Sequence, residues 1–180
     1  AAKNGRRKSD FDFGTNPCSV IILRPYQFCN LTECVVRAED TESTLERKVR
    51  LATILGTFQS TLTNFPYLRK IWQQNTEEEN LLGVSLTGQM DNLALYKGEI
   101  SLEKLREVAV TVNTEFAISL GINTSTAITC VKPSGTVSQL VDSASGLHTR
   151  HSDYYVRSVR ADNKDPLTQF LKEAGIPWEP

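Results

Sequence analysis

The sequence predicts an α/β fold, because short apolar runs with strand character alternate with longer stretches that have helical spacing. The best strand candidates are TAITCVK at 126–132 and the buried-type run LLGVSLTG at 81–88. A long helix is predicted from about Thr41, and NFPYLRKIW at 64–72 is expected to break and restart at Pro66. At 180 residues the chain is long enough to bury the core of one domain.

The chain before the first helix is predicted to be loop and extended segments. Residues 1–15 are charged and contain glycine, so we expect a loop there. CSVIIL at 18–23 is a β-branched run closed by Pro25, which predicts a strand or an extended loop. CVVRAED at 34–40 is a second candidate for extended structure.

Two further helices are predicted from the residues at their ends. Ser101 is suited to cap a helix that Gly121 would end. Asp165, followed by proline, has the residue types that start a helix, and Gly175 would end it. Between these helices, YYVRSVR at 154–160 alternates as a strand does.

Composition and charge exclude several classes of function. The net charge of -1 argues against a broad electrostatic footprint for nucleic acid or an anionic membrane. No apolar run approaches the roughly 20 residues that span a bilayer, and the N-terminus lacks the apolar stretch of a signal peptide. We therefore expect no nucleic-acid partner, no membrane partner and a cytoplasmic location. The start without methionine suggests a piece of a longer protein, with a trimmed version of a complete protein as the alternative.

The cysteines lack the closely spaced pairs of a zinc site, so we expect no metal. A disulfide scaffold is not expected either, because the chain shows no secretory signal and cytosolic thiols stay reduced. The thiols are then either buried for packing or used in chemistry. Packing is the prediction for Cys34 and Cys130.

The first group of residues that could carry chemistry is NPCSVIILRPYQFCNL at 16–31. Pro17 fixes the backbone just before Cys18 and would hold that side chain on a defined tip. The amide of Asn16 can donate and accept, so it could orient a sugar hydroxyl. Cys29 lies far enough along to fold back beside Cys18, and two thiols at disulfide distance can deliver two electrons. Read alone, these residues also fit a turn with thiols buried for packing.

The second group is VKPSGTVS at 131–138, directly after a predicted strand. Glycine lets the backbone approach a ligand closely, and successive N–H groups with Ser and Thr hydroxyls suit a phosphate. The spacing is not that of a Walker A loop. Without further context, a capped helix start explains these residues equally well.

In order along the chain, these blocks resemble the catalytic subunit of ribonucleotide reductases. The blocks are NPC and FCNL within 16–31, TGQMD at 87–91, and CVKPSGTVSQLVDSASGLHTRHSDYYVRSVR at 130–160, and they cover nearly the whole chain from Asn16. The match is closest to the adenosylcobalamin-dependent class II type. The KPSGT form of the loop is similar to that class rather than to the aerobic di-iron class. The glycyl-radical class fits poorly, because FCNL with Cys29 is typical of thiol-reduced enzymes.

The resemblance implies a ten-stranded α/β barrel with a central finger loop that carries the radical cysteine. Residues 1–180 would be one incomplete segment of that barrel, with 16–31 as the finger-loop region and 126–140 as a strand and phosphate loop. The implied reaction is reduction of ribonucleoside di- or triphosphates to deoxyribonucleotides, with adenosylcobalamin as cofactor. The implied partners are the remaining parts of the reductase chain and a thioredoxin-type reductant.

The resemblance also implies roles for single residues. Cys18 would become a thiyl radical and abstract the 3′-hydrogen of the ribose, and Asn16 would hydrogen-bond that ribose. Cys29 would be one member of the reducing cysteine pair, whose partner in the family lies well upstream. The substrate phosphates would be held by Ser134, Gly135, Thr136, Val137 and Ser138.

One residue departs from the family. The family has a glutamate two residues after the radical cysteine, as acid/base for the 3′-hydroxyl, and this sequence has Val20 there. Because general acid–base catalysis is typically worth about 100- to 10,000-fold in rate, poor turnover is expected even in a complete enzyme. The segment alone is expected to be inactive and marginally soluble, because a half-barrel without its partner exposes strand edges and apolar surface. The alternative function is a degenerate remnant that binds nucleotide phosphate. A thiol redox protein using Cys18 and Cys29 is disfavoured, because the low-pKa CxxC arrangement is missing.

Overall fold

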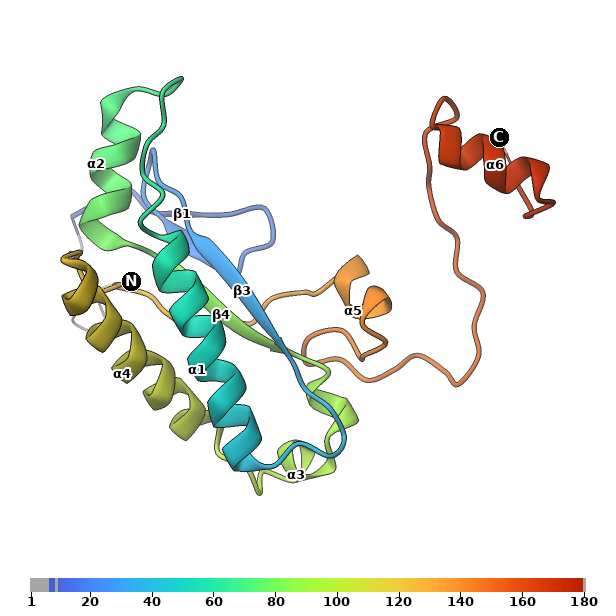
Figure 1. Cartoon of the computed structure of the whole chain (residues 1–180), viewed down its shortest axis with the longest axis horizontal. Coiled ribbons are helices and arrows are strands. Elements are labelled where there is room, and N and C mark those ends of the chain that lie inside the picture. Colours follow the sequence, from blue (N-terminus) through green and yellow to red (C-terminus); the bar gives the residue numbers. More distant parts are fainter. Residues whose placement is uncertain (1–6, 9, 180) are drawn as a thin grey trace. The chain divides into compact units, whose positions relative to one another are not determined.

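The computed structural model describes residues 7–8 and 10–179. The chain forms two compact units, one up to Arg150 and the other from His151. Within the described residues, no helix is long and apolar enough to cross a membrane. The first unit combines strands and helices, as the alternation in the sequence predicts (Figure 1).

The centre of the first unit is a parallel pair of strands. β3 (Asn30–Val35) pairs with β4 (Leu82–Thr87), in a register that sets Asn30 opposite Leu82 and Val35 opposite Thr87. The strand predicted at 81–88 is therefore confirmed. The segment predicted at 34–40 is wrong in its bounds, because pairing with β4 makes the strand begin at Asn30 and turn structure begins soon after Val35.

The predicted strand at 126–132 is also wrong in extent. Only one parallel bridge forms there, between Thr129 and Val84, although the Cys130 N–H donates to the Val84 carbonyl at 3.0 Å. The segment thus lies along the free edge of β4 without forming a full ladder. The apolar pattern of residues 126–132 identified a segment that lies beside a strand. The pattern could not show how many backbone hydrogen bonds this segment forms with that strand.

Two long helices cover one face of β3 and β4 (Figure 1). α1 (Glu42–Gln59) starts at Thr41, whose side chain forms a capping box with Thr44. α4 (Leu102–Leu120) runs from the Ser101 cap to Gly121, which adopts a left-handed φ of 67°. These residues confirm the predicted start of α1 and both predicted ends of α4. The core beneath the helices consists of Cys34, Val36, Leu45, Val49, Leu82, Val84, Ile100, Leu105, Ala109 and Ile128.

Shorter elements connect these parts. The helix expected to restart at Pro66 begins later, at Lys70, because the chain first forms a turn in which the Leu68 N–H donates to the Phe65 carbonyl. The remaining elements of the first unit are β1 (Gly14–Thr15), β2 (Ile22–Leu23), α2 (Lys70–Glu79), η2 (Gln89–Asp91), α3 (Leu93–Tyr96) and α5 (Thr136–Leu140). β1 falls within the stretch 1–15 that was expected to be loop, and residues 1–6 and 9 of that stretch lie outside the described residues.

The second unit contains α6 (Pro166–Glu173), capped as predicted by Asp165, whose carboxylate accepts from the Leu167 N–H at 2.8 Å. The strand predicted at 154–160 is wrong, because none of these residues is assigned to a strand. Its apolar side chains remain exposed, including Val156 at 98%. An alternating pattern produces a strand only where a partner strand supplies hydrogen bonds.

A buried ionic cluster joins the N-terminal segment, the chain after β2 and the end of α2. Arg7 binds Glu79 through two hydrogen bonds, Nε to Oε1 at 2.8 Å and Nη2 to Oε2 at 2.6 Å. Gln27 Nε2 donates to Glu79 Oε2 at 2.5 Å, and Arg24 Nε lies 3.7 Å from the same oxygen. Burial alone would raise the pKa of Glu79, but the hydrogen bonds and the two arginine charges lower it overall. We call Arg7, Arg24, Gln27 and Glu79 the buried cluster.

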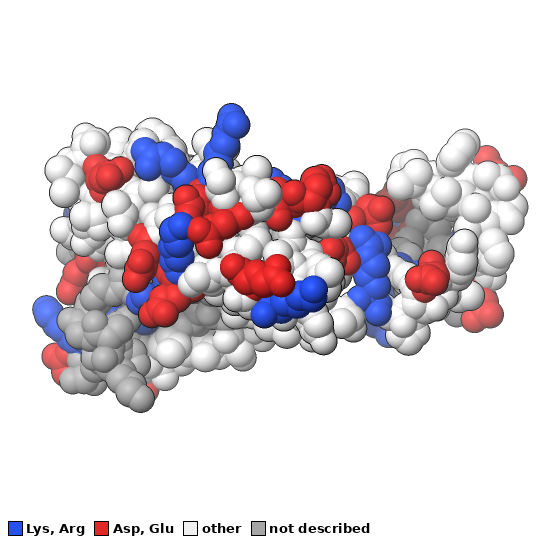
Figure 2. Space-filling model, turned by 90° about the horizontal axis from the view of Figure 1, so that it is seen from below, with Lys and Arg blue, Asp and Glu red and all other residues white. Residues whose placement is uncertain are grey.

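Acidic and basic side chains are mixed over the surface that Figure 2 shows. Several form pairs with partners distant in sequence, such as Lys104 with Glu42 and Glu46. Pairs of this exposed kind contribute little to stability. Because acidic and basic side chains alternate on this surface, it carries no large patch of positive or negative charge.

Candidate active site

The residues Asn16 and Cys18 lie in a β-hairpin. β1 and β2 pair antiparallel, with Thr15 opposite Ile22, and the loop between them holds Asn16 to Ile21. The Asn16 side-chain oxygen accepts from the N–H groups of Val20 at 2.9 Å and Ile21 at 3.2 Å. Since a carbonyl oxygen has two lone pairs, these bonds occupy it. Any contact between Asn16 and a sugar hydroxyl would therefore use the amide nitrogen as donor.

Cys18 is presented at the exposed tip of this hairpin. The next residue, Ser19, has a φ of 56°, so the backbone reverses direction directly after the thiol. Val20 is half-buried and brings no titratable group to the tip. Cys29 lies outside the hairpin, immediately before β3. The hairpin thus brings together Asn16, Cys18 and Val20 of the predicted site.

The second predicted group forms the turn into α5. Gly135 adopts a φ of 58° and a ψ of -125°, a backbone conformation that favours glycine. Ser138 is buried and its hydroxyl donates to the Gly135 carbonyl at 2.7 Å, which holds the turn closed. Ser134 is 4% exposed, and its buried hydroxyl has no hydrogen-bond partner among the described residues. Thr136 and Val137 are exposed at the start of α5.

Sequence reasoning missed an ion pair beside this turn. Lys132 Nζ donates to Glu33 Oε2 at 2.7 Å, and both side chains are largely buried. The other carboxylate oxygen, Oε1, is buried without a hydrogen-bond partner among the described residues. Burial alone would raise the pKa of Glu33, but Lys132 and the nearby hydroxyls of Ser134 and Thr87 lower it. Only the position of Lys132 in KPSGT and of Glu33 two residues from FCNL could have drawn attention to them.

The hairpin and the α5 turn lie on the same face of the sheet. Leu82 and Val84 point into the core beneath the helices, so Gly83 and Thr87 point to the opposite face. A Cβ at Gly83 would lie 3.1 Å from the side chain of Ile21, which follows the hairpin tip. The Thr87 hydroxyl accepts from the Gly146 N–H at 2.8 Å and thereby anchors the chain that follows α5. We call this side, opposite α1 and α4, the open face.

Replacing Gly83 with alanine is expected to destabilise the chain by about 1 to 3 kcal/mol, because overpacking forces neighbours apart. The added Cβ would lie 2.4 Å from Leu31 Cδ2 and 3.0 Å from Cys130 Sγ. Urea unfolding followed by circular dichroism measures the change. Gly14→Ala is the matched control, because a Cβ there meets nothing within 4 Å. An equal effect of both substitutions would contradict the close packing over Gly83.

The other thiols have different environments. Cys34 belongs to the core beneath the helices, as predicted, and burial raises its pKa to about 12. Cys130 was also predicted to be a packing thiol, but it is only half-buried and its sulfur lies over Gly83 on the open face. Burial raises the pKa of Cys29 and raises that of Cys130 to about 11. Both thiols are therefore protonated at neutral pH.

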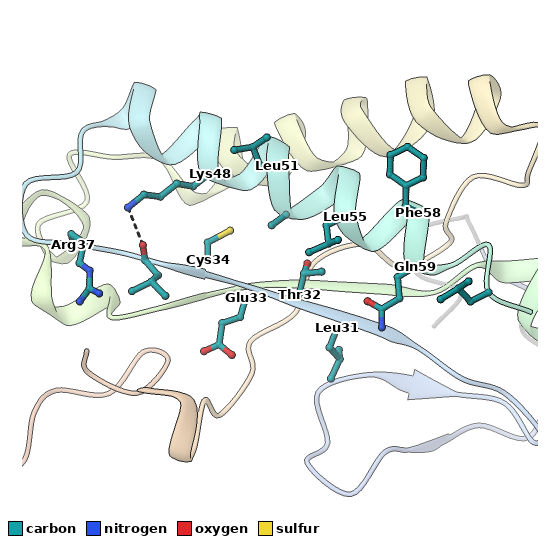
Figure 3. Close-up of a pocket in the computed structure, with 13 residues that line it drawn as sticks. Leu31, Thr32, Glu33, Cys34, Arg37, Lys48, Leu51, Leu55, Phe58 and Gln59 are labelled. Carbon is teal, nitrogen blue, oxygen red and sulfur yellow. Dashed lines mark hydrogen bonds between the residues drawn. The ribbon is translucent and has the colours of Figure 1, made fainter. Parts of the chain in front are cut away.

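An apolar groove of about 920 Å³ runs between the outer edge of β3 and α1 (Figure 3). Its helical side includes the exposed side chains of Leu51, Leu55 and Phe58 on α1. Within the described residues, β3 pairs with β4 alone, so its other edge faces this groove. Lys48 spans the groove and donates to the Val35 carbonyl at 3.0 Å. A free strand edge beside exposed leucines is typical of a surface that another segment covers.

Comparison with solved structures shows which class of protein this chain resembles. The fold resembles that of a B12-dependent (class II) ribonucleotide reductase, with a TM-score of 0.61 and 26% sequence identity. The similarity covers 77% of this chain and 23% of that one. No protein-family model matches the chain. The resemblance to class II ribonucleotide reductases that the ordered motifs predicted is confirmed.

The similar curated proteins are adenosylcobalamin-dependent ribonucleoside-triphosphate reductases. The one from Lactobacillus acidophilus is 29% identical over 93% of this chain, and the one from Lactobacillus leichmannii is 27% identical over 92%. The chain spans about a quarter of their length, 26% in both cases.

Proposed function

We propose that this chain is a catalytic-centre segment of an adenosylcobalamin-dependent ribonucleotide reductase, which makes deoxyribonucleotides for DNA synthesis. The observation that carries the proposal is the open face, where Ile21 of the Cys18 hairpin packs over Gly83 and Lys132 of the KPSGT turn pairs with Glu33. A nucleotide whose phosphates rest at Ser134 would extend its sugar toward the hairpin. The ion pair of Lys132 with Glu33 ties the start of the KPSGT turn to β3. The names of the curated relatives favour a triphosphate substrate.

Each residue has a definite task in this proposal. Ser134 to Ser138 hold the phosphates, with the Ser134 hydroxyl and the backbone N–H groups of the turn as donors. The Asn16 amide nitrogen orients the ribose. Cys18, as a thiyl radical, removes the 3′-hydrogen, and Cys29 supplies one of the two hydrogens that reduce the sugar. The substrate's 2′-hydroxyl leaves as water.

Adenosylcobalamin is included in the proposal because the similar curated proteins are named as dependent on it. Among the described residues, no group of three or more His, Cys, Asp or Glu side chains could hold a metal ion, and we assign no residue of this segment to adenosylcobalamin. When bound, that cofactor would supply the organic radical from which the thiyl radical at Cys18 derives. In this proposal the chain presents the Cys18 thiol on a hydrogen-bonded turn and holds the nucleotide beside it.

The segment would form part of a ten-stranded α/β barrel, with the β1–β2 hairpin as the tip of its finger loop. The groove between β3 and α1 supports this, because a neighbouring strand of the same reductase would pair with the free edge of β3 and cover Leu51, Leu55 and Phe58. The remaining parts of the reductase chain are thus the first partner. A cytoplasmic thioredoxin-type protein would restore the thiols after each turnover.

Isotope exchange tests the proposal in a reductase chain that contains this segment. Deuterium from solvent should enter adenosylcobalamin by way of the Cys18 thiol, and Cys18→Ser should abolish that exchange. Cys34→Ala is the control, because Cys34 lies in the core beneath the helices and should leave exchange intact. Undiminished exchange in the Cys18→Ser variant would overturn the proposed role.

Val20 favours a second candidate function, a degenerate segment that binds nucleotide phosphate without radical chemistry. Equilibrium dialysis with a ribonucleoside triphosphate separates the two. Binding that Ser134→Ala weakens, together with no Cys18-dependent exchange, would select the degenerate function.

A further inference from the structure

The TGQMD block at 87–91, at the end of β4 and in η2, binds the chain that follows α5. The Ala144 carbonyl accepts from the Gly88 N–H at 2.8 Å and from the Thr87 hydroxyl at 3.1 Å. The Ala144 N–H donates to Asp91 Oδ2 at 2.8 Å, and the Thr87 hydroxyl also accepts from the Gly146 N–H at 2.8 Å. One short block therefore binds both backbone groups of Ala144, which is buried.

The hydrogen bonds continue from there into the turn that is proposed to hold the phosphates. The Ser143 N–H donates to the Ser138 carbonyl at 2.9 Å, and the Ser138 hydroxyl donates to the Gly135 carbonyl at 2.7 Å. Gly146 packs against the start of the same turn, because a Cβ added to it would lie 2.8 Å from the Lys132 carbonyl oxygen. The TGQMD block thus supports the KPSGT turn at both of its ends.

We propose that Thr87 and Asp91 are positioning residues for the nucleotide phosphates. By binding the backbone of Ala144 and Gly146, they hold the KPSGT turn in the conformation that receives the phosphates. The inference rests on the phosphate site of the proposed function, and it applies to the reductase and to the degenerate function alike. A site that is formed in only a fraction of the molecules binds its ligand more weakly by that fraction, so a loosened turn raises the Kd.

Asp91 is a strong acceptor for the Ala144 N–H because it is charged. Burial alone would raise the pKa of Asp91, but hydrogen bonds from Arg150 and from the Ala144 N–H lower it overall. Hydrogen bonds to a charged acceptor are stronger than those between neutral groups. The Arg150 side chain is half exposed, so its ion pair with Asp91 contributes little by itself. The bond to Ala144 is then the contact through which Asp91 supports the turn.

Thr87→Val and Asp91→Ala test the positioning role in a reductase chain that contains this segment. Each variant removes side-chain oxygens that bind Ala144 and leaves every residue of the KPSGT turn unchanged. Equilibrium dialysis with CTP is expected to give a Kd about tenfold higher for each variant than for the parent chain, because a buried backbone group loses its partner and the turn opens more often.

Three control variants separate positioning from a general loss of stability. Ser85→Ala removes another buried hydroxyl of β4, one that donates to the Thr32 carbonyl at 3.2 Å, and should leave the Kd for CTP unchanged. Asp91→Asn keeps an oxygen that can accept from the Ala144 N–H, so it should recover most of the affinity that Asp91→Ala loses. Arg150→Ala removes the exposed ion pair and should change the Kd by about twofold or less.

Amide hydrogen exchange at residues 135–138 is a second measurement, and it needs no nucleotide. Exchange there is expected to be faster in Thr87→Val and Asp91→Ala than in the parent chain and in Ser85→Ala. Unchanged exchange, or a Kd that Ser85→Ala raises as much, would overturn the inference. A parent chain that binds no CTP would contradict the proposed phosphate site, and exchange at 135–138 would still decide whether the TGQMD block holds the turn.

Discussion

Replacing Val20 with glutamate, in a reductase chain that contains this segment, is expected to raise the rate of deoxyribonucleotide formation about 100- to 10,000-fold. The side chain lies two residues beyond Cys18, where a carboxylate could exchange a proton with the sugar. Valine has no titratable group. The Val20 N–H binds the Asn16 side chain through the backbone, so the substitution should leave the hairpin turn in place. Chromatographic measurement of the deoxynucleotide product gives the rate.

The matched control for this prediction is Val20→Gln. Glutamine has nearly the same size and polarity as glutamic acid but cannot take part in proton transfer. Its rate should remain at the level of the valine chain. No gain from glutamate, or an equal gain from glutamine, would contradict an acid–base role at this position. The first result would also favour the degenerate function.

Replacing Glu79 with glutamine is expected to lower the free energy of unfolding by about 3 to 5 kcal/mol. Glu79 has a side chain 5% exposed and binds Arg7, whose side chain is 3% exposed. Glutamine preserves the volume but leaves the buried Arg7 guanidinium without a counter-charge, whereas Arg24 keeps its ion pair with Glu78 at 2.8 Å. Urea unfolding, followed by circular dichroism, measures the loss.

Glu77→Gln is the control on the same helix. Glu77 is exposed and bonds Thr63 and Gln73, so its replacement should change stability by about 0.5 kcal/mol or less. Equal losses in the free energy of unfolding for the two substitutions would show that the buried cluster stabilises the fold no more than an exposed hydrogen bond does. Because Arg24 and Gln27 follow β2, the Glu79 variant should also exchange amide hydrogens faster in the hairpin.

The sequence predicted structure correctly where the stabilising interactions join residues that are close in sequence, and failed where they join distant segments. The starts of α1, α4 and α6 were predicted well, since an N-cap such as Thr41, Ser101 or Asp165 acts within three residues of itself. The strand at 154–160 failed, and the strand at 126–132 shrank to one bridge, because a ladder depends on a partner elsewhere in the chain.

For the candidate site too, features that are local in sequence were predicted, and features that join distant segments were not. The sequence by itself determined the motifs around Cys18 and Ser134, and with them the resemblance to class II ribonucleotide reductases, because those blocks are contiguous. Only the tertiary structure decided that Lys132 pairs with Glu33, 99 residues away, and that Cys130 belongs to the open face rather than to the core. Contacts of that range arise when β3, β4 and the segment beside them align, and the spacing of residues along the chain carries no record of that alignment.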